Sequence, residues 1–333
     1  MLVGLYDNIV RNIELTPPQG DTGGINSPIR QGVEGYPMIV WYYNNYTNEY
    51  IFLGKYNFNN DKGTEDVYGF EDGDESWEVG NNEKLLCFFD ESEDPTWENW
   101  RTAFETRFPD DDDSLTKTKN PYTDEQIADR LAGLREVVHW VSSNVDWVDE
   151  NKEAVTFNVI PTAADITAAT SSGRTAAEEA FRREFKQYFN LDLITFFFVF
   201  TEFFLMVDNR AKNMFLTRYK VSNDRPESAD WYSAYGDNVV TLQASTSTTD
   251  TYAGWFSLPY DMDTSIGTNN VGVYKFNYGY ETGDYQPDGS VVFNGQKSKL
   301  WVAFTQVFGP EIQTMYTFFQ NNLTYTSVET AFE

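Results

Sequence analysis

The segment that most constrains the fold is the apolar run Leu193–Val207, which reads LITFFFVFTEFFLMV. Its 15 residues fall short of the roughly 20 that a helix needs to cross a bilayer, and Glu202 lies inside it. A helix that is apolar on most of its sides is stable only when other elements cover it. We therefore expect a buried helix here, surrounded by a sizeable core.

The composition supplies the material for such a core. Of the 333 residues, 41% are hydrophobic and 17% are aromatic, so the chain is not a disordered acidic tail. The length indicates one large domain or two lobes. A single cysteine, Cys87, excludes an internal disulfide, and a single histidine, His139, argues against a histidine-ligated zinc site and a Ser-His-Asp triad. His139 lies in a helical pattern, where we expect a structural role.

The net charge narrows the choice of partners. The chain carries 52 Asp and Glu against 24 Lys and Arg, a formal net charge of −28. Nucleic acids and anionic membranes repel such a chain, and we find no local basic patch. We therefore expect no nucleic-acid partner and no membrane partner. The opening segment, Met1–Asp7, lacks the basic and apolar regions of a secretory signal.

The first part of the chain has the pattern of β-structure. Residues 36–43 and 50–56 are rich in β-branched and aromatic types, and the turn residues 44–48 between them predict a hairpin. Further strands are predicted over 76–79 and 84–89.

From residue 97 the spacing of apolar residues changes to a helical one. We predict a helix over 97–108, and a solvated loop for the acidic run Asp110–Asp113 that follows it. A calcium site in this run is the alternative, although the alternating spacing of an EF-hand loop is missing. The expected buried face of the helix consists of Trp97, Trp100, Phe104 and Phe108.

Helix signals recur through the rest of the chain. A capping box at Thr123 starts a helix with a buried stripe, a second helix covers about 175–189, and Asn190 or Asp192 caps the apolar helix. A last helix over 298–322 should bend or break at Gly309-Pro310. Strands are predicted at 214–219 and 254–258, a polar insertion at about 222–252, and a long loop at about 265–292.

Two polar clusters follow these buried elements. Asp208 and Asn213 lie between the apolar helix and the next strand, and Asp261 and Asp263 end the strand after it. Carboxylate and carboxamide oxygens on adjacent strand ends suit Mg²⁺ or Mn²⁺. The spacing D-x-x-x-x-N is that of a protein-kinase catalytic loop, in which the aspartate accepts a hydroxyl proton and the asparagine holds a metal.

A purely structural interpretation of these clusters stays open. In that interpretation Asp208 and Asn213 cap a helix end and order a turn, and Asp261 and Asp263 accept hydrogen bonds from backbone N–H groups. If the clusters bind phosphate groups instead, Arg210 and Lys212 would offset the phosphate charge.

A set of ordered motifs resembles the CotH (spore coat protein H) kinase-like family, and more closely the CotH-like module of minor structural proteins of tailed bacteriophages. The matching stretches run from about residue 35 to 310, and Ser76–Asn82 is similar to the family's S-W-E-x-x-N. The stretch 260–267 is similar to [WY]-D-x-D-x-x-x-G. The full set comprises Gly35–Pro37, Leu53–Lys62, Ser76–Asn82, Phe104–Pro109, Val207–Met214 and Tyr260–Gly272.

The resemblance implies an α+β fold, a divergent protein-kinase-like one with two lobes. Residues 1–95 would form the β-rich N-terminal lobe and residues 96–333 the mainly helical C-terminal lobe. If the site is active, the resemblance implies Mg²⁺ and ATP as cofactors, and otherwise none. It implies Asp208 as catalytic base. The further assignments are Asn213, Asp261 and Asp263 as metal ligands, with Lys62, Glu78 and Lys212 on the nucleotide side.

The leading hypothesis is a structural protein of a tailed-phage virion, in the tail or baseplate, with other virion proteins as partners in a homo- or hetero-oligomer. The alternative is an active ATP-dependent protein Ser/Thr kinase of the CotH type, placed in the bacterial cytoplasm or spore coat. A host-glycan adhesion module is a third class, based on surface-capable Trp and Tyr. Phage members of the family carry a segment before the part that matches Leu5–Asn8, so we expect this sequence to be a piece of a longer virion protein.

Overall fold

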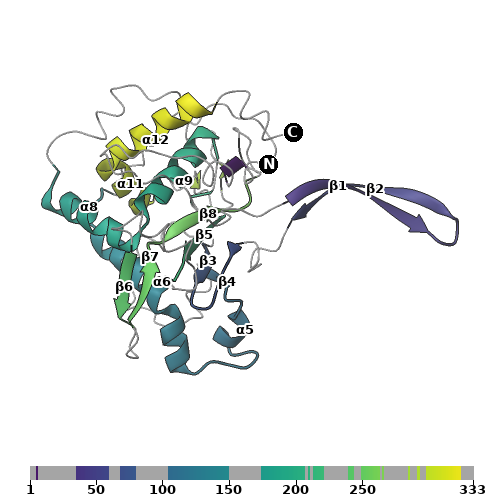
Figure 1. The fold of residues 1–333 in the computed structure, drawn as a ribbon, viewed down its shortest axis with the longest axis horizontal. Helices are drawn as coiled ribbons and strands as arrows, with labels where there is room; N and C mark the ends of the chain where they lie inside the picture. Colours follow the sequence, from purple (N-terminus) through teal and green to yellow (C-terminus); the bar gives the residue numbers. More distant parts are fainter. Residues whose placement is uncertain are drawn as a thin grey trace.

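The computed structural model has a mixed α+β architecture, with strands in the N-terminal part and most helices later in the chain (Figure 1). It describes residues 5–6, 35–59, 68–79, 104–149, 174–206, 209–210, 213–220, 239–243, 249–262, 265, 284–285, 291–292 and 298–323. Cys87 and the strand predicted over 84–89 lie outside the described residues.

The predicted N-terminal hairpin is confirmed. Strands β1 (Gly35–Asn44) and β2 (Glu49–Asn59) pair antiparallel, with a bulge between Val40 and Trp41. Asn44 orders the turn, because its side-chain oxygen accepts a hydrogen bond of 2.9 Å from the Tyr46 backbone N–H. The hairpin projects from the body of the molecule (Figure 1). We call residues 35–59 the arm.

The body is built on a four-stranded antiparallel sheet in the order β4-β3-β5-β8. The strands are β3 (Glu75–Val79), β4 (Phe104–Phe108), β5 (Met214–Arg218) and β8 (Phe256–Pro259). Strand β3 lies before the predicted lobe boundary at residue 95, and the other three lie after it. One sheet therefore joins residues from both predicted parts, and the division into lobes stays a prediction.

The predicted helix over 97–108 is wrong for its described part, because residues 104–108 form strand β4. Phe104 and Phe108 are buried, Glu105 is exposed, and Thr106 between them is buried again. A spacing of four residues places two side chains on one face of a helix, but it also places them on one face of a strand. The alternation through Glu105 and Thr106 is what distinguishes the strand.

The helices predicted from residue 123 onward are confirmed, and so are the predicted caps at Thr123 and Asn190. Thr123 and Thr175 each form a capping box, and the Asn190 side chain accepts a hydrogen bond of 3.1 Å from the Leu193 N–H. The break at Gly309-Pro310 is also confirmed, since one helix ends at Val307 and the next begins at Gly309. The helices are α5 (Asp112–Leu115), α6 (Asp124–Asn144), α8 (Ala176–Tyr188), α9 (Leu191–Phe203), α11 (Lys299–Val307) and α12 (Gly309–Asn322).

Helix α9, the apolar run, is buried along nearly its whole length and packs against α12 and β8 (Figure 1). Its phenylalanines meet aromatic side chains of α12. Phe196 and Phe200, for example, lie with their ring centroids 5.3 and 6.1 Å from that of Phe319 on α12. None of the described helices is long and apolar enough to span a bilayer.

Two segments expected to be irregular contain short strands. The polar insertion includes the hairpin of β6 (Val239–Gln243) and β7 (Thr249–Ala253), and the long loop includes β9 (Asp284–Tyr285) and β10 (Val291–Val292). Threonine is common in the first of these segments, and its β-branched side chain favours strands despite its polarity. The remaining residues of both segments lie outside the described part.

Candidate functional site

The candidate site lies where the start of β5 meets the end of β8. Met214 pairs with Pro259, so Asn213, just before Met214, and Asp261, two residues after Pro259, belong to adjoining chain segments. The Tyr260 N–H donates a hydrogen bond of 3.1 Å to the Asn213 carbonyl. The expectation that the two polar clusters occupy adjacent strand ends is confirmed for this described pair.

Both residues adopt left-handed backbone conformations, with φ of 56° for Asn213 and 50° for Asp261. Asn and Asp enter this region more readily than other residues with a Cβ atom. The two turns are therefore favoured by the Asn and Asp residues at these positions. Asp261 is exposed and Asn213 is half-buried, so both lie at or near the surface.

Asn209 ties the two turns together, and it was missed in the sequence. Its Nδ2 donates to the Tyr260 carbonyl at 2.8 Å and to the Asn213 carbonyl at 3.4 Å. The residue is fully buried, and its Oδ1 has no hydrogen-bond partner among the described residues. A carboxamide suits this role, because it is one of the few side chains with two donor hydrogens for two neighbouring carbonyls. The only signal for it in the sequence is the position of Asn209 inside the D-x-x-x-x-N stretch.

The structure describes only part of the predicted site. Asp208, Lys62, Lys212 and Asp263 lie outside the described residues, so their roles stay predictions. Within the described part of the chain, no three Asp, Glu, His or Cys side chains gather closely enough to hold a metal ion. Asn213 and Asp261 supply two oxygen-bearing side chains of the kind that Mg²⁺ prefers.

The predicted phosphate-facing role of Arg210 is wrong. Its side chain is fully buried and forms an ion pair with Glu202, the carboxylate within α9. It also donates hydrogen bonds to Thr201 Oγ1 at 2.9 Å and to the Phe198 carbonyl at 3.2 Å. A charge inside an apolar helix is stable only beside an opposite charge, and Arg210 supplies it. The guanidinium is therefore directed into the core.

Glu78, a predicted nucleotide-side residue, is bound to Arg107 on the neighbouring strand β4. Arg107 Nε donates to Glu78 Oε2 at 2.7 Å. Burial opposes the charge on Arg107, but the hydrogen bond and ion pair with Glu78 outweigh it and raise the Arg107 pKa above its usual value. Glu78 lies opposite Phe215 on β5, whose ring stacks on Tyr260 at 5.2 Å. Glu78 thus lies on the same face of the sheet as Phe215. Its role in nucleotide binding stays a prediction.

A second group of buried charges links β3, β5 and α6. Arg218 Nε donates to Glu75 Oε1 at 3.1 Å, and Arg130 Nε donates to Asp111 Oδ2 at 2.7 Å. The prediction of a solvated loop for Asp110–Asp113 is therefore wrong for Asp111, which is only 8% exposed, and for Asp112 and Asp113, which begin helix α5. The cation of Arg130 requires a nearby carboxylate, and Asp111 provides it. These buried ion pairs hold β3, β5 and α6 together.

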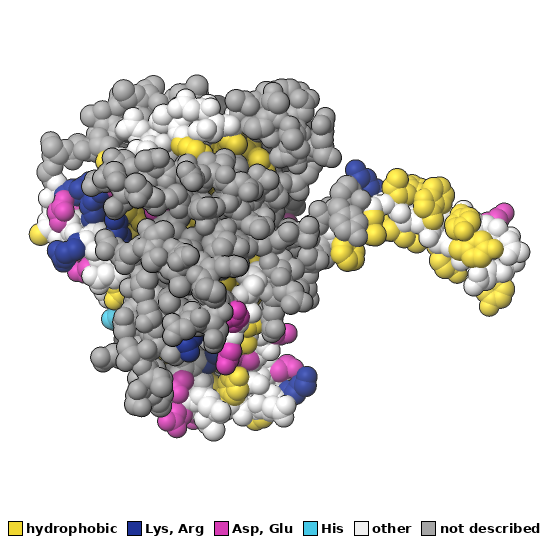
Figure 2. All heavy atoms as spheres, viewed as in Figure 1, with side chains coloured by type: hydrophobic (Ala, Val, Ile, Leu, Met, Phe, Trp, Pro, Cys, Tyr) yellow, Lys and Arg dark blue, Asp and Glu magenta, His cyan; other side chains and the backbone are white. Residues whose placement is uncertain are grey.

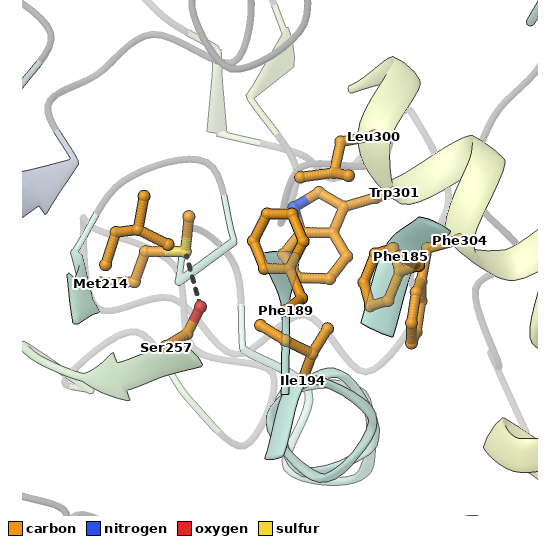
Figure 3. A pocket seen from close by; sticks show the side chains of 9 residues that line it. Phe185, Phe189, Ile194, Met214, Ser257, Leu300, Trp301 and Phe304 are labelled. Atoms are coloured by element: carbon orange, nitrogen blue, oxygen red, sulfur yellow. Dashed lines mark hydrogen bonds between the residues drawn. The ribbon is translucent and has the colours of Figure 1, made fainter. Parts of the chain in front are cut away.

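Among the described residues, a small cavity lies in the aromatic core beside Met214, the residue that follows Asn213 (Figure 3). Its volume of about 10 Å³ is at the lower limit for a single water molecule. Ser257 supplies the one side-chain hydroxyl of its lining, and that hydroxyl contacts Met214 Sδ at 3.8 Å. The cavity is too small and too apolar to hold a nucleotide. Its lining consists of Phe185, Phe189, Ile194, Met214, Leu216, Ser257, Leu300, Trp301 and Phe304.

His139 is exposed on α6, so it is not part of the core (Figure 2).

Comparison of the chain with protein-family models, with curated proteins and with solved structures found no match. The resemblance to a CotH-like family therefore rests on the motifs in the sequence.

Proposed function

We propose that this protein is a structural component of a tailed-phage virion, in the tail or baseplate, built on a CotH-like kinase fold. The observation that carries the proposal is the arm. Its side chains include Tyr46, Tyr50 and Ile39, which are 97%, 70% and 65% exposed. Figure 2 shows hydrophobic side chains along the arm, where it projects from the body.

Such an arm is typical of a protein that works in an assembly. A free monomer rarely exposes a large apolar patch, and an isolated two-stranded ribbon is marginally stable in water. Tyr, Trp and Phe, which dominate the arm, are also the residues enriched at the centres of protein interfaces. Contact with other virion proteins would cover these side chains and stabilise the ribbon.

Mass spectrometry of purified particles tests the proposal. We expect peptides from both the arm and the body in particles of the phage that encodes the chain, in a fixed ratio to a known tail protein. Particles banded twice on a density gradient are the sample, and the soluble fraction of the same lysate is the control. Absence of these peptides from the particles would exclude a virion role.

A second candidate function is Mg²⁺- and ATP-dependent phosphotransfer to protein, and the position of Asn213 and Asp261 on adjoining strand ends favours it. In this proposal Asp208 accepts the proton of the attacking hydroxyl, and Asn213 and Asp261, with Asp263 as the competing choice, hold Mg²⁺. Lys62, Glu78 and Lys212 would contact the nucleotide. Mg²⁺ would neutralise phosphate charge, which a chain of net charge −28 has few cations to offset.

For this candidate we expect ATP to raise the melting temperature only when Mg²⁺ is present. Asp208→Ala and Asp261→Ala should each abolish transfer of labelled phosphate, because each removes a group that the reaction requires. Asp110→Ala, at an exposed aspartate outside the site, is the matched control and should leave transfer unchanged. A chain that binds no nucleotide at millimolar ATP is not a kinase.

A further inference from the structure

The arm is apolar on both of its faces. Cross-strand pairing places Trp41 opposite Phe52 and Tyr43 opposite Tyr50 on one face, with ring centroids 5.1 and 4.9 Å apart. The opposite face carries Tyr42, Ile51, Tyr56 and Phe58, all exposed. A hairpin that packs one face against its own body is expected to carry polar residues on the other face. The arm does not have this pattern, because both of its faces are apolar.

The exposed area of the arm is as large as a stable interface. The arm's large hydrophobic side chains are between 42% and 97% exposed. With about 200 Å² for each fully exposed large side chain, they present roughly 1,200 Å² in total. A protein–protein interface of standard size buries about 800 Å² on each partner. About half of the total, roughly 600 Å², lies on each face. Two such faces packed together would therefore bury about 1,200 Å² in all, which is the lower end of the range for stable interfaces.

The charges point to the partner. Within residues 35–59 the only charged side chains are Glu49 and Lys55, so the arm is formally neutral in a chain of net charge −28. Two copies of the body repel each other, and a cationic partner would be attracted to the body instead of the arm. A neutral apolar surface carried away from an acidic body suits a partner with the same charge distribution, which is a second copy of the chain.

The length of the arm makes this contact compatible with the repulsion. Strand β2 has 11 residues, which corresponds to roughly 35 Å at about 3.3 Å per residue. Two arms that overlap in opposite directions would hold their bodies about that far apart. The Debye length is about 8 Å at physiological ionic strength, so the bodies would be largely screened from each other.

We propose that the arm binds the arm of a second copy of this chain, with apolar face packed on apolar face in a two-fold symmetric dimer. The same patch then serves on both partners, as a two-fold contact requires. The face of Trp41, Tyr43, Tyr50 and Phe52 is the expected centre, because its rings are already paired across the strands. This inference rests on the proposed assembly function and names a partner for it.

Sedimentation equilibrium and light scattering of the full chain test the proposal. We expect a dimer of 38.3 kDa chains. Its dissociation constant should decrease as salt is raised from about 0.01 M to about 0.15 M, because the Debye length falls from about 30 Å to about 8 Å over this range. The double variant Trp41→Ser/Phe52→Ser should raise the dissociation constant more than 100-fold, since each truncation acts twice across the two-fold axis. Tyr46→Ser, which removes a 97% exposed ring from the turn, is the matched control and should change it less than threefold.

A crosslink gives an independent measurement. In a Cys87→Ser background, Tyr43→Cys places one thiol on the arm, and mild oxidation should yield a disulfide-linked dimer. Asp110→Cys, at an exposed position on the body, should remain monomeric under the same conditions. A wild-type chain that is monomeric at 50 µM or so, or a dimer that the double variant leaves intact, overturns the arm-to-arm contact.

The outcomes for the two proposals are distinguishable. A monomer in solution that is present in virions would exclude arm-to-arm binding and leave the assembly function standing. A dimer that is absent from virions would exclude the virion function and leave the contact standing. Unchanged near-ultraviolet circular dichroism and an unchanged melting temperature of the monomeric variants would show that the body is intact.

Discussion

Replacement of Arg210 by methionine is expected to lower the free energy of unfolding by about 3–5 kcal/mol. Arg210 and Glu202 are both almost completely buried, at 1% and 2% exposed, and they form an ion pair. The guanidinium also lies 4.2 Å above the ring of Phe198. Methionine fills most of the same volume but removes the cation, so the Glu202 carboxylate would remain in the apolar core without its counter-charge.

Urea denaturation followed by circular dichroism measures this loss. The control is Arg183→Met, which removes a guanidinium that is 67% exposed and paired with Glu184, and should cost less than about 1 kcal/mol. The double variant Arg210→Met/Glu202→Leu should recover part of the loss, because it removes both charges together. If Arg210→Met costs no more than Arg183→Met, the ion pair is not in the core.

Replacement of Gly133 by alanine is expected to destabilise the protein by about 1–3 kcal/mol, although the same change stabilises most helices. Alanine favours a helix interior over glycine by about 1 kcal/mol. A Cβ at position 133 of α6, however, would overlap the Arg218 guanidinium. That group has little freedom to move, since it is bound to Glu75 and lies 3.9 Å from the Tyr252 ring and 4.7 Å from that of Trp255.

A double-mutant cycle separates the two contributions. In an Arg218→Ala background the obstacle is gone, and Gly133→Ala should then stabilise the protein by about 0.5–1 kcal/mol. Ala132→Gly, at the exposed position next to it, reports the propensity of α6 alone and should cost about 1 kcal/mol. A stabilising Gly133→Ala in the otherwise unchanged chain would contradict the close approach of Arg218 to this helix.

Features set by neighbouring residues were predicted correctly from the sequence. The caps at Thr123 and Asn190 act within three residues, and the break at Gly309-Pro310 follows from the chemistry of proline alone. The burial of α9 follows in the same way, because a helix that is apolar on most of its sides is stable only when other elements cover it.

Features that depend on distant partners were not predictable in this way. Phe104 and Phe108 satisfy helix and strand spacing equally well, and the pairing of β4 with β3 decides between them. Asp111 seemed to be a surface residue because its partner, Arg130, lies 19 positions away. Arg210 was assigned to phosphate because it lies near Asp208, whereas its ion pair with Glu202 is formed only in the fold.

The candidate site divides in the same manner. The adjacency of Asn213 and Asp261 could be predicted, because two antiparallel strands that are neighbours in a sheet bring the start of one to the end of the other. The bridging role of Asn209 could not, since nothing in a sequence indicates which of two neighbouring polar residues will be directed inward. The buried environment of its carboxamide exists only after both turns have formed.

The central place of β3 in its sheet has a consequence for how the protein is made. Glu75 on β3 binds Arg218 on β5, which is synthesised 143 residues later. At about 5–20 residues per second, a ribosome needs roughly 7–29 s to cover that distance. During this interval Trp77 and its strand have β4 as a neighbour on one side only. The nascent chain therefore carries an unfinished sheet edge for much of its translation, and the body closes only after β5 and β8 have emerged.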